Sequence, residues 1–182
     1  MTKPLTTRDK LLTEARRLLW ARGYSAVSLR QITTAAGVDV ALVSRYFGSK
    51  QGLFEATLDG AFDVPEVADE SELLEMVVHM FVSAPRGGEM PSMLQLMLMN
   101  AHDPEVGDRV RAAQIAGMQD KLTATLGGDA RRAALFMSAV LGMSVAEKSL
   151  HLPGIPPHDT PEYEAQLRHL LSCALAWRPA AR

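Results

Sequence analysis

The 182-residue sequence predicts an all-α protein with about nine helices, in which a three-helix N-terminal module precedes a larger helical body. Three observations favour this fold class. Apolar residues recur at helical spacing, and no strand-type alternation persists. Glycine, proline and capping residues divide the chain into segments of helical length. Basic residues gather in the first 50 positions and acidic residues in the remainder, which indicates two parts of different character.

The first three predicted helices are short and closely spaced. The first covers residues 7–22, and its apolar stripe consists of Leu11, Leu12, Ala15, Leu18 and Leu19. A second helix follows Ser28, because Ser28 and Gln31 have the spacing of a capping box. Gly37 suits the left-handed conformation that ends a helix, and a third helix then runs to Phe47.

Residues 28–50 therefore have the build of a helix-turn-helix, a motif whose second helix enters the DNA major groove. Because the three short helices can share one core, residues 1–50 are predicted to form a helix-turn-helix DNA-binding domain. Residues 51–182 are predicted to form a second, helical domain, whose methionine-rich middle and C-terminal helices, described below, suit ligand binding and dimerisation. A connecting helix over about residues 50–62 joins the two.

The body is divided into helices by its breakers and capping residues. Helices are predicted over residues 69–82, 91–100, 105–126, 129–150 and 161–178. Pro91 suits the first turn of its helix, and Asp103 and Asp129 are placed to cap the next two. Thr160 followed by Pro161 marks the start of the last helix.

Charge is distributed unevenly along the chain. The 19 Lys and Arg residues and 21 Asp and Glu residues give a net charge of −2, which by itself argues against a nucleic-acid binder. Residues 1–50, however, hold nine basic and three acidic residues, net +6, which leaves −8 for the other 132. A basic head on an acidic body suits phosphate binding by the head. Taken alone, the basic residues also fit an ordinary solvated surface.

The same N-terminal residues resemble the tetracycline-repressor (TetR) family of bacterial transcription regulators. The matching positions are Ser28, Ile32, Ala36–Gly37–Val38, Tyr46–Phe47, Ser49–Lys50 and Leu53–Phe54. The match covers about the first third of the chain, and beyond it the resemblance is only architectural. It implies nine helices, a dimer and, commonly, repression. One position departs: Ser44 stands where the family often has a phosphate-contacting Tyr, so that contact should be weaker or replaced.

The candidate DNA contacts are Ser28, Arg30, Val40, Ala41, Leu42, Ser44, Arg45, Tyr46 and Lys50. Arg45 is the candidate for a bidentate contact with a guanine edge, and Val40, Ala41 and Leu42 could pack on thymine methyl groups. Tyr46 and Lys50 should reach phosphate. Two alternatives stay open: Ser28 as a pure helix cap, and Leu42 as a buried contact to the first helix.

Two C-terminal helices have patterns suited to association. Small side chains recur every four residues at Ala134, Ser138, Gly142 and Ala146, which permits close helix approach. The last helix presents Leu167, Leu170, Leu171, Ala174 and Trp177 on one face. Two such helices from each of two chains would make the four-helix dimer interface that the resemblance implies. The alternative is that both stripes pack inside one subunit.

Methionines are concentrated in the middle of the chain. Because Met is flexible and polarisable, a cavity lined by it can adapt to varied apolar ligands. The candidate pocket residues are Met76, His79, Met80, Met93, Met97 and Met118. The alternatives are ordinary core packing for the methionines and a hydrogen-bonded or half-exposed side chain for His79.

No metal site, cofactor or enzymatic activity is predicted. The sequence shows no Gly-rich phosphate loop, nucleophile elbow or recognisable carboxylate pair. The single Cys173 excludes an intrachain disulfide and suits a reducing cytoplasm. The polar N-terminus is unlike a signal peptide, and the most apolar window, residues 93–99, is too short to span a bilayer. We therefore expect a protein of the bacterial cytoplasm that joins the nucleoid when bound to its operator.

These observations predict a homodimeric regulator of transcription that binds double-stranded DNA at a palindromic operator. We expect a repressor that a small, largely apolar effector releases from that operator. Two other interpretations remain open. One is a DNA-binding regulator without small-molecule sensing. The other is a small-molecule-binding or enzymatic helical protein that has lost its DNA function.

Overall fold

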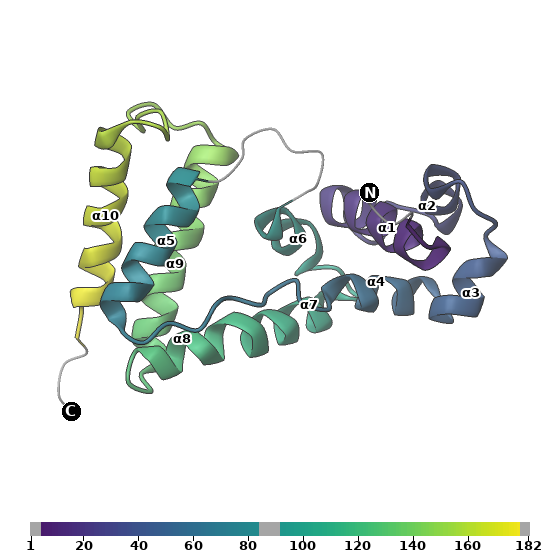
Figure 1. Cartoon of the computed structure of the whole chain (residues 1–182), viewed down its shortest axis with the longest axis horizontal. Helices are drawn as coiled ribbons and strands as arrows, with labels where there is room; N and C mark the ends of the chain where they lie inside the picture. The colour runs from purple at the N-terminus through teal and green to yellow at the C-terminus, as the bar shows by residue number, and fades with distance from the viewer. Residues whose placement is uncertain (1–4, 84–91, 179–182) are drawn as a thin grey trace. The chain divides into compact units, whose positions relative to one another are not determined.

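The computed structural model of the chain describes residues 5–83 and 92–178, and every regular element within them is helical (Figure 1). The elements are α1 (Thr7–Arg22), α2 (Leu29–Ala36), α3 (Ala41–Phe47), α4 (Lys50–Leu58), α5 (Glu70–Ser83), α6 (Met93–Asn100), α7 (Gly107–Gln114), the π-helical turn η1 (Ile115–Gln119), α8 (Asp120–Thr125), α9 (Ala130–Lys148) and α10 (Pro161–Ala176). Since α7, η1 and α8 follow one another without a break, the described residues form nine helical segments. The predicted all-α fold class is confirmed.

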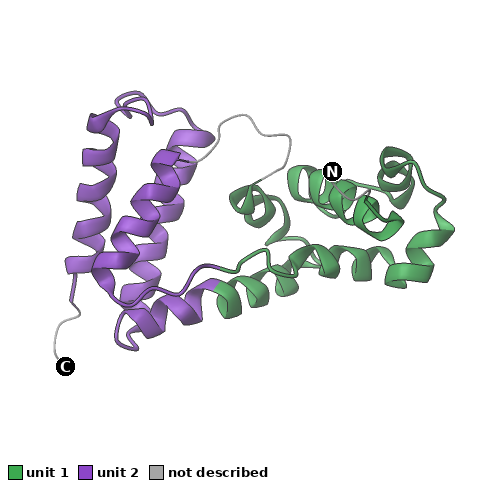
Figure 2. Ribbon diagram, viewed as in Figure 1, with its two compact units in different colours: residues 1–63, 88–117 green, residues 64–87, 118–182 purple. Residues whose placement is uncertain are grey.

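The chain folds into two compact units (Figure 2). Of the described residues, 5–63 and 92–117 form the head unit, and 64–83 and 118–178 form the body unit. In the head unit α1 packs against α2, α4 and α6, whereas the body unit consists of α5, α8, α9 and α10. Because α4 packs against α1 and α3, α6 against α1, and α7 against α4 and α6, the head unit extends beyond the predicted boundary after residue 50.

Several helix ends are set by local side-chain hydrogen bonds. The Ser28 hydroxyl accepts a hydrogen bond from the Gln31 amide at 3.3 Å, and Gln31 Oε1 accepts one from the Ser28 amide at 2.7 Å. Gly37 takes the left-handed conformation with φ of 66° at the end of α2. Asp129 and Thr160 cap α9 and α10. The predicted capping box, the turn at Gly37 and the caps at Asp129 and Thr160 are therefore confirmed. Asp103, which was expected to cap the following helix, does not cap it: the N-cap residue of α7 is Val106, and no side chain caps that end.

Two predicted helices have different ends or geometry. The helix α4 stops at Leu58 rather than near Phe62, because the chain turns at Gly60 with φ of +68°. The helix predicted over residues 105–126 begins at Gly107 and contains η1, where Gly117 lies against Phe62. Ser92 caps α6, and Pro91, which was expected to open that helix, lies outside the described residues.

The buried Arg132 links α9 to three other segments of the body unit. Arg132 on α9 donates hydrogen bonds to Glu70 Oε2 at 2.8 Å, to the Leu175 carbonyl at 2.8 Å and to the Leu126 carbonyl at 3.3 Å. These partners lie at the start of α5, near the end of α10 and directly after α8. Because a buried guanidinium is costly without partners, this cluster fixes how the helix ends meet.

Candidate nucleic-acid interface and ligand cavity

The helix α3 turns one face to the core of the head unit and the other to solvent. Val43 is fully buried and anchors the helix, while 44% of Val40 and 41% of Tyr46 remain exposed. Ala41, Ser44 and Arg45 are also exposed. The solvent face of α3 therefore carries an apolar patch at its start and hydroxyl and guanidinium groups at its end.

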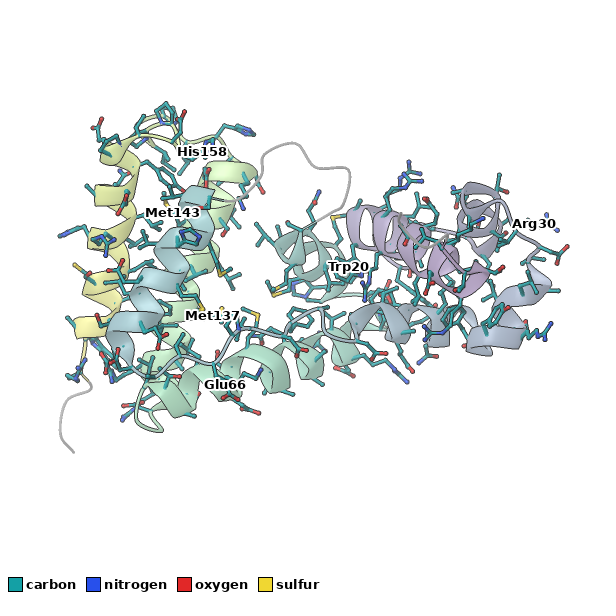
Figure 3. The ribbon with its side chains drawn as sticks, viewed as in Figure 1. Trp20, Arg30, Glu66, Met137, Met143 and His158 are labelled. Atoms are coloured by element: carbon teal, nitrogen blue, oxygen red, sulfur yellow. The ribbon has the colours of Figure 1, made fainter. Side chains whose placement is uncertain are left out.

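Two residues expected at this face have roles in the fold. Leu42 is half-buried, so it is only partly available to a partner. Ser28 is exposed, but its hydroxyl accepts the Gln31 amide and donates to Gln31 Oε1 at 3.0 Å. The capping alternative for Ser28 is therefore the one that its geometry favours. Arg30 extends from α2 with an exposed side chain (Figure 3).

Lys50 has an internal partner that the sequence pattern did not reveal. Its ammonium donates to the Tyr24 carbonyl at 2.7 Å and stands 4.0 Å from the centre of the Tyr24 ring. Burial lowers the pKa of Lys50 below its ordinary value. One of the three ammonium donors is therefore held within the head unit, and two remain for the expected phosphate contact.

Hydrogen bonds from α6 and from the turn that follows it brace the head unit. The buried Asn100 side chain accepts from the Tyr24 amide at 2.8 Å and donates to the Leu19 carbonyl at 3.1 Å. Asp103 accepts from the Ser25 hydroxyl at 2.6 Å. Although burial raises the pKa of Asp103, hydrogen bonds from Ser25 and from backbone amides outweigh it and lower that pKa.

The helix α4 is fastened on two sides within the head unit. Trp20 of α1 donates to the Thr57 hydroxyl at 3.0 Å, and Arg109 of α7 forms an ion pair with Glu55. Sequence reasoning assigned no role to these residues. The signal that could have found them is a polar residue in an otherwise apolar helix stripe, as at Thr57 and Asn100. Because α4 directly follows α3, these contacts hold the exposed face of α3 in place.

The body unit contains a cavity of about 410 Å³ between the segment of residues 64–68, α5, α8 and α9. Its lining residues are Val64, Pro65, Glu66, Val67, Ala68, Leu73, Met76, Val77, Met80, Phe81, Met118, Lys121, Leu122, Ala124, Thr125, Phe136, Met137 and Val140. Met137 on α9 and Glu66 in the segment before α5 are labelled in Figure 3. The volume and the largely apolar lining are typical of small-molecule sites.

The structure brings together only some of the expected pocket residues. Met76, Met80 and Met118 line the cavity, and Met137 joins them although sequence reasoning did not include it. Met93 and Met97 belong to α6 in the head unit and do not line it. His79 is absent from the lining as well, because its exposed side chain lies 3.3 Å from the Ser83 hydroxyl. That position corresponds to the hydrogen-bonded alternative for His79.

The two candidate association stripes differ in exposure. On α9, Ala134, Ser138 and Gly142 are exposed and Ala146 is half-buried. Leu170 on α10 and Trp177 directly after it are exposed, but Leu167, Leu171 and Ala174 are buried in the core of the body unit. Those three are corrected from dimer contacts to core residues, because a side chain already buried within one chain has little surface left for a partner.

Neither a metal centre nor a membrane span is found in residues 5–83 and 92–178. Those residues contain no group of three or more His, Cys, Asp or Glu side chains that could hold a metal ion. The Cys173 sulfur lies 3.8 Å from His169 Nε2, a pair that sequence reasoning missed. None of the described helices combines the length and apolar character that crossing a bilayer requires.

Two family models match the sequence and together cover most of it. The model described as bacterial regulatory proteins of the tetR family matches residues 11–57. The model described as the tetracyclin repressor-like C-terminal domain matches residues 71–174, which is more than half of the chain. The first match contains α2 and α3, and the second contains most of the body unit.

Similar proteins are regulators rather than enzymes. The transcriptional repressor ComR of Escherichia coli is 36% identical over 66 residues, which is 36% of this chain and 31% of ComR. The transcriptional repressor AcnR of Corynebacterium glutamicum is 29% identical over 103 residues, which is 56% of this chain and 55% of AcnR. The chain thus matches from about a third to about half of the length of these relatives.

Solved structures share the fold. NalD of Pseudomonas aeruginosa, described as the secondary repressor of the MexAB-OprM multidrug efflux pump, aligns with a TM-score of 0.65 and 20% identity, covering 92% of this chain and 94% of NalD. The multidrug binding protein EbrR complexed with proflavin aligns with a TM-score of 0.61 and 20% identity, covering 93% and 99%. At these identities the likeness shows the arrangement of helices and nothing more.

Proposed function

The chain belongs to the TetR family of bacterial regulatory proteins, and from this premise we propose that it is a dimeric, sequence-specific repressor of transcription. It binds a palindromic operator, and a small, largely apolar ligand releases it. The observation that carries the proposal is the exposed face of α3, which ends a helix-turn-helix in a family of regulators. The similarity to ComR and AcnR, both repressors, supports the sign of regulation.

The DNA contacts follow from the chemistry of the α3 face. Arg45 has the reach and the paired donors for a guanine edge. Val40 and Ala41 offer methyl groups to thymine, with Leu42 as a partly buried neighbour. Tyr46 and Ser44 present hydroxyl groups to phosphate, and Arg30 on α2 neutralises charge beside them. Lys50 contributes its two remaining donors while Tyr24 holds the third.

Dimerisation is required by the size of the target. One recognition helix covers too few base pairs to select a site, whereas a twofold dimer places two such helices about 34 Å apart, one helical turn of DNA. The exposed stripe of α9 together with Leu170 on α10 and Trp177 directly after it is the surface that suits the partner.

The body cavity is the proposed site of the effector. Its volume of about 410 Å³ and its mostly apolar lining suit a compact organic molecule. Such a ligand changes DNA occupancy only through different affinities for the DNA-bound and released conformations. An effector that binds both forms equally would contradict this mechanism.

Selection from a random duplex library, with the enriched duplexes retested at two salt concentrations, tests the DNA-binding proposal. We expect a palindromic motif with half-sites about one helical turn apart and a steep loss of affinity with salt. Salt-sensitive binding without an enriched motif would mean that the head unit binds DNA through its charge alone, without sequence preference. If the folded protein fails to bind any duplex at low salt, the proposed regulation of transcription is overturned.

A further inference from the structure

The cavity of the body unit holds one half-buried cation in an apolar wall. Of its eighteen lining residues, only Glu66 and Lys121 carry a charge. Thr125 adds a hydroxyl, but that hydroxyl donates to the Lys121 carbonyl at 3.2 Å within the helix. The polar character available to a ligand therefore comes mainly from these two charged side chains.

The Lys121 ammonium is incompletely satisfied. Lys121 Nζ donates a long hydrogen bond, 3.3 Å, to the carbonyl of Val64. No carboxylate of residues 5–83 and 92–178 forms an ion pair with it. An ammonium has three donors, so two are left for water or a ligand. Because Lys121 is half-buried, less water solvates it than an exposed lysine, and an anion placed there is attracted more strongly.

Glu66 does not offset this preference. Its side chain is exposed, so water solvates the carboxylate and screens its attraction for a cationic ligand. Glu66 and Lys121 line the same cavity, but Lys121 is the less exposed of the two. Its ammonium group therefore determines which ligand charge the cavity prefers. A cationic ligand would meet Lys121 with repulsion, and a neutral one would leave its two donors to water.

We infer that the effector of this cavity is an amphipathic carboxylic acid, whose carboxylate binds Lys121 Nζ and whose hydrocarbon part lies against Met76, Phe81 and Met137. This inference rests on the proposed ligand site and names the chemical class that occupies it. The methionines adapt to the shape of the hydrocarbon. The cavity therefore selects ligands that combine a carboxylate with an apolar part, whatever the carbon skeleton of that part.

Calorimetric titration of the full chain with three ten-carbon probes tests this inference. The probes are decanoate, 1-decanol and decyltrimethylammonium, each below its micelle-forming concentration. Wild type should bind decanoate about tenfold more tightly than 1-decanol, the range expected for a hydrogen bond to a charged group, and the cation most weakly. Lys121→Met should abolish the difference between acid and alcohol, whereas Lys121→Arg should retain it. Lys10→Met, which removes an exposed lysine of the head unit, is the matched control and should change nothing.

An occluding variant separates failure of the inference from failure of the ligand site itself. Val140→Phe adds volume to a half-buried position of the lining and should reduce binding of every probe that enters the cavity. If 1-decanol or the cation binds as well as decanoate and Val140→Phe weakens all three, the cavity is a ligand site but the carboxylate preference is wrong. If no probe binds, or Val140→Phe leaves binding unchanged, the ligand site itself is contradicted.

Discussion

Arg45 and Lys50 are two cations of the same head unit in opposite surroundings. Arg45 is exposed, and its guanidinium lies 6.0 Å from the centre of the Tyr46 ring. Lys50 is half-buried and bound to Tyr24. The sequence predicted that both lie beside the DNA-reading helix, since α3 and α4 are local in the chain. It did not predict which cation is held internally, because the partner is a backbone carbonyl 26 residues away.

Replacement of Arg45 by alanine should relax sequence preference. Loss of a bidentate contact should cost about 1–3 kcal/mol of binding free energy and should remove discrimination at one base position of each half-site. Fluorescence anisotropy with single-position operator variants measures both effects. Arg22→Ala, at the exposed end of α1, is the control. A uniform loss of affinity across all variants would assign Arg45 to phosphate instead.

Replacement of Lys50 by methionine should weaken the fold as well as DNA binding. The variant loses the hydrogen bond and the ring contact to Tyr24, which together should lower the free energy of unfolding by about 1–2 kcal/mol. Urea unfolding without DNA measures this term. Affinity for all duplexes should also fall, with a shallower salt dependence. An unchanged free energy of unfolding would mean that Lys50 contributes only to phosphate binding.

At the scale of the elements, α2 and α9 show which helix ends local sequence signals can predict. Ser28 with Gln31, Gly37 and Asp129 determine helix ends through partners two to four residues away, and those ends were predictable. The π-helical turn η1 was not predictable, because it lies where Gly117 packs against Phe62, 55 positions earlier in the chain. Met137 could not be assigned to the cavity from sequence for a similar reason, because its position depends on how α9 packs against α8 and α10.

Substitution of Gly117 by alanine should destabilise the head unit. A Cβ at this position would lie 2.7 Å from Phe62 Cβ and 2.8 Å from the Phe62 carbonyl oxygen. Relief of this overlap must shift backbone, so we expect a loss of about 1–3 kcal/mol in the free energy of unfolding. Gly142→Ala is the matched control, because open space surrounds that helical glycine and alanine should stabilise it by about 0.5–1 kcal/mol. Equal stabilisation by both changes would mean that η1 relaxes without cost.

The Glu70–Arg132 pair should make the body unit sensitive to acid. The hydrogen bond from Arg132 lowers the pKa of Glu70 below its ordinary value of 4.5. A lowered folded-state pKa means that the stabilisation is fully present above the unfolded value and is lost as pH falls through the folded one. At about pH 7, Glu70→Gln should therefore lower the free energy of unfolding by about 1 kcal/mol, a modest figure because Glu70 is partly exposed.

Urea midpoints at several pH values check this prediction. The gap between wild type and Glu70→Gln should close as pH falls from about 5 to about 3, since protonation of Glu70 removes the same charge. Glu162→Gln, which neutralises an exposed carboxylate at the start of α10, serves as the control. A gap that persists at low pH would show that the substitution acts through packing rather than through charge.

At the scale of the whole molecule, the surfaces left open by each unit indicate how it assembles. Ala134, Ser138 and Gly142 of α9 are exposed in the single chain, and so are Leu170 of α10 and Trp177, which directly follows α10. Exposed apolar side chains beside a stripe of small ones suit a partner helix that approaches closely. The predicted dimer stripe on α9 has three exposed members, and the fourth, Ala146, is half-buried. On α10 the sequence pattern overestimated the interface, because one helical face can contain both core and surface positions.

Substitution of Gly142 by leucine separates folding from assembly. Nothing lies within 4 Å of a Cβ at this position, so the single chain should accommodate the larger side chain without loss of stability. Between two closely packed helices the same side chain must push the partner away, at a cost of about 1–3 kcal/mol. The dissociation constant of the dimer, measured by sedimentation equilibrium, should therefore rise about 10- to 100-fold.

A control variant and an operator-binding measurement determine whether a weaker dimer of Gly142→Leu identifies α9 as the interface. Ala130→Leu, at the exposed start of α9, introduces the same side chain outside the stripe and should leave the dimer unchanged. Operator binding by Gly142→Leu should require more protein and become steeper with concentration, because two chains must now assemble on the DNA. If dimerisation and operator affinity both stay at wild-type values, α9 does not form the interface, and the apolar surface at Leu170 and Trp177 must serve another partner.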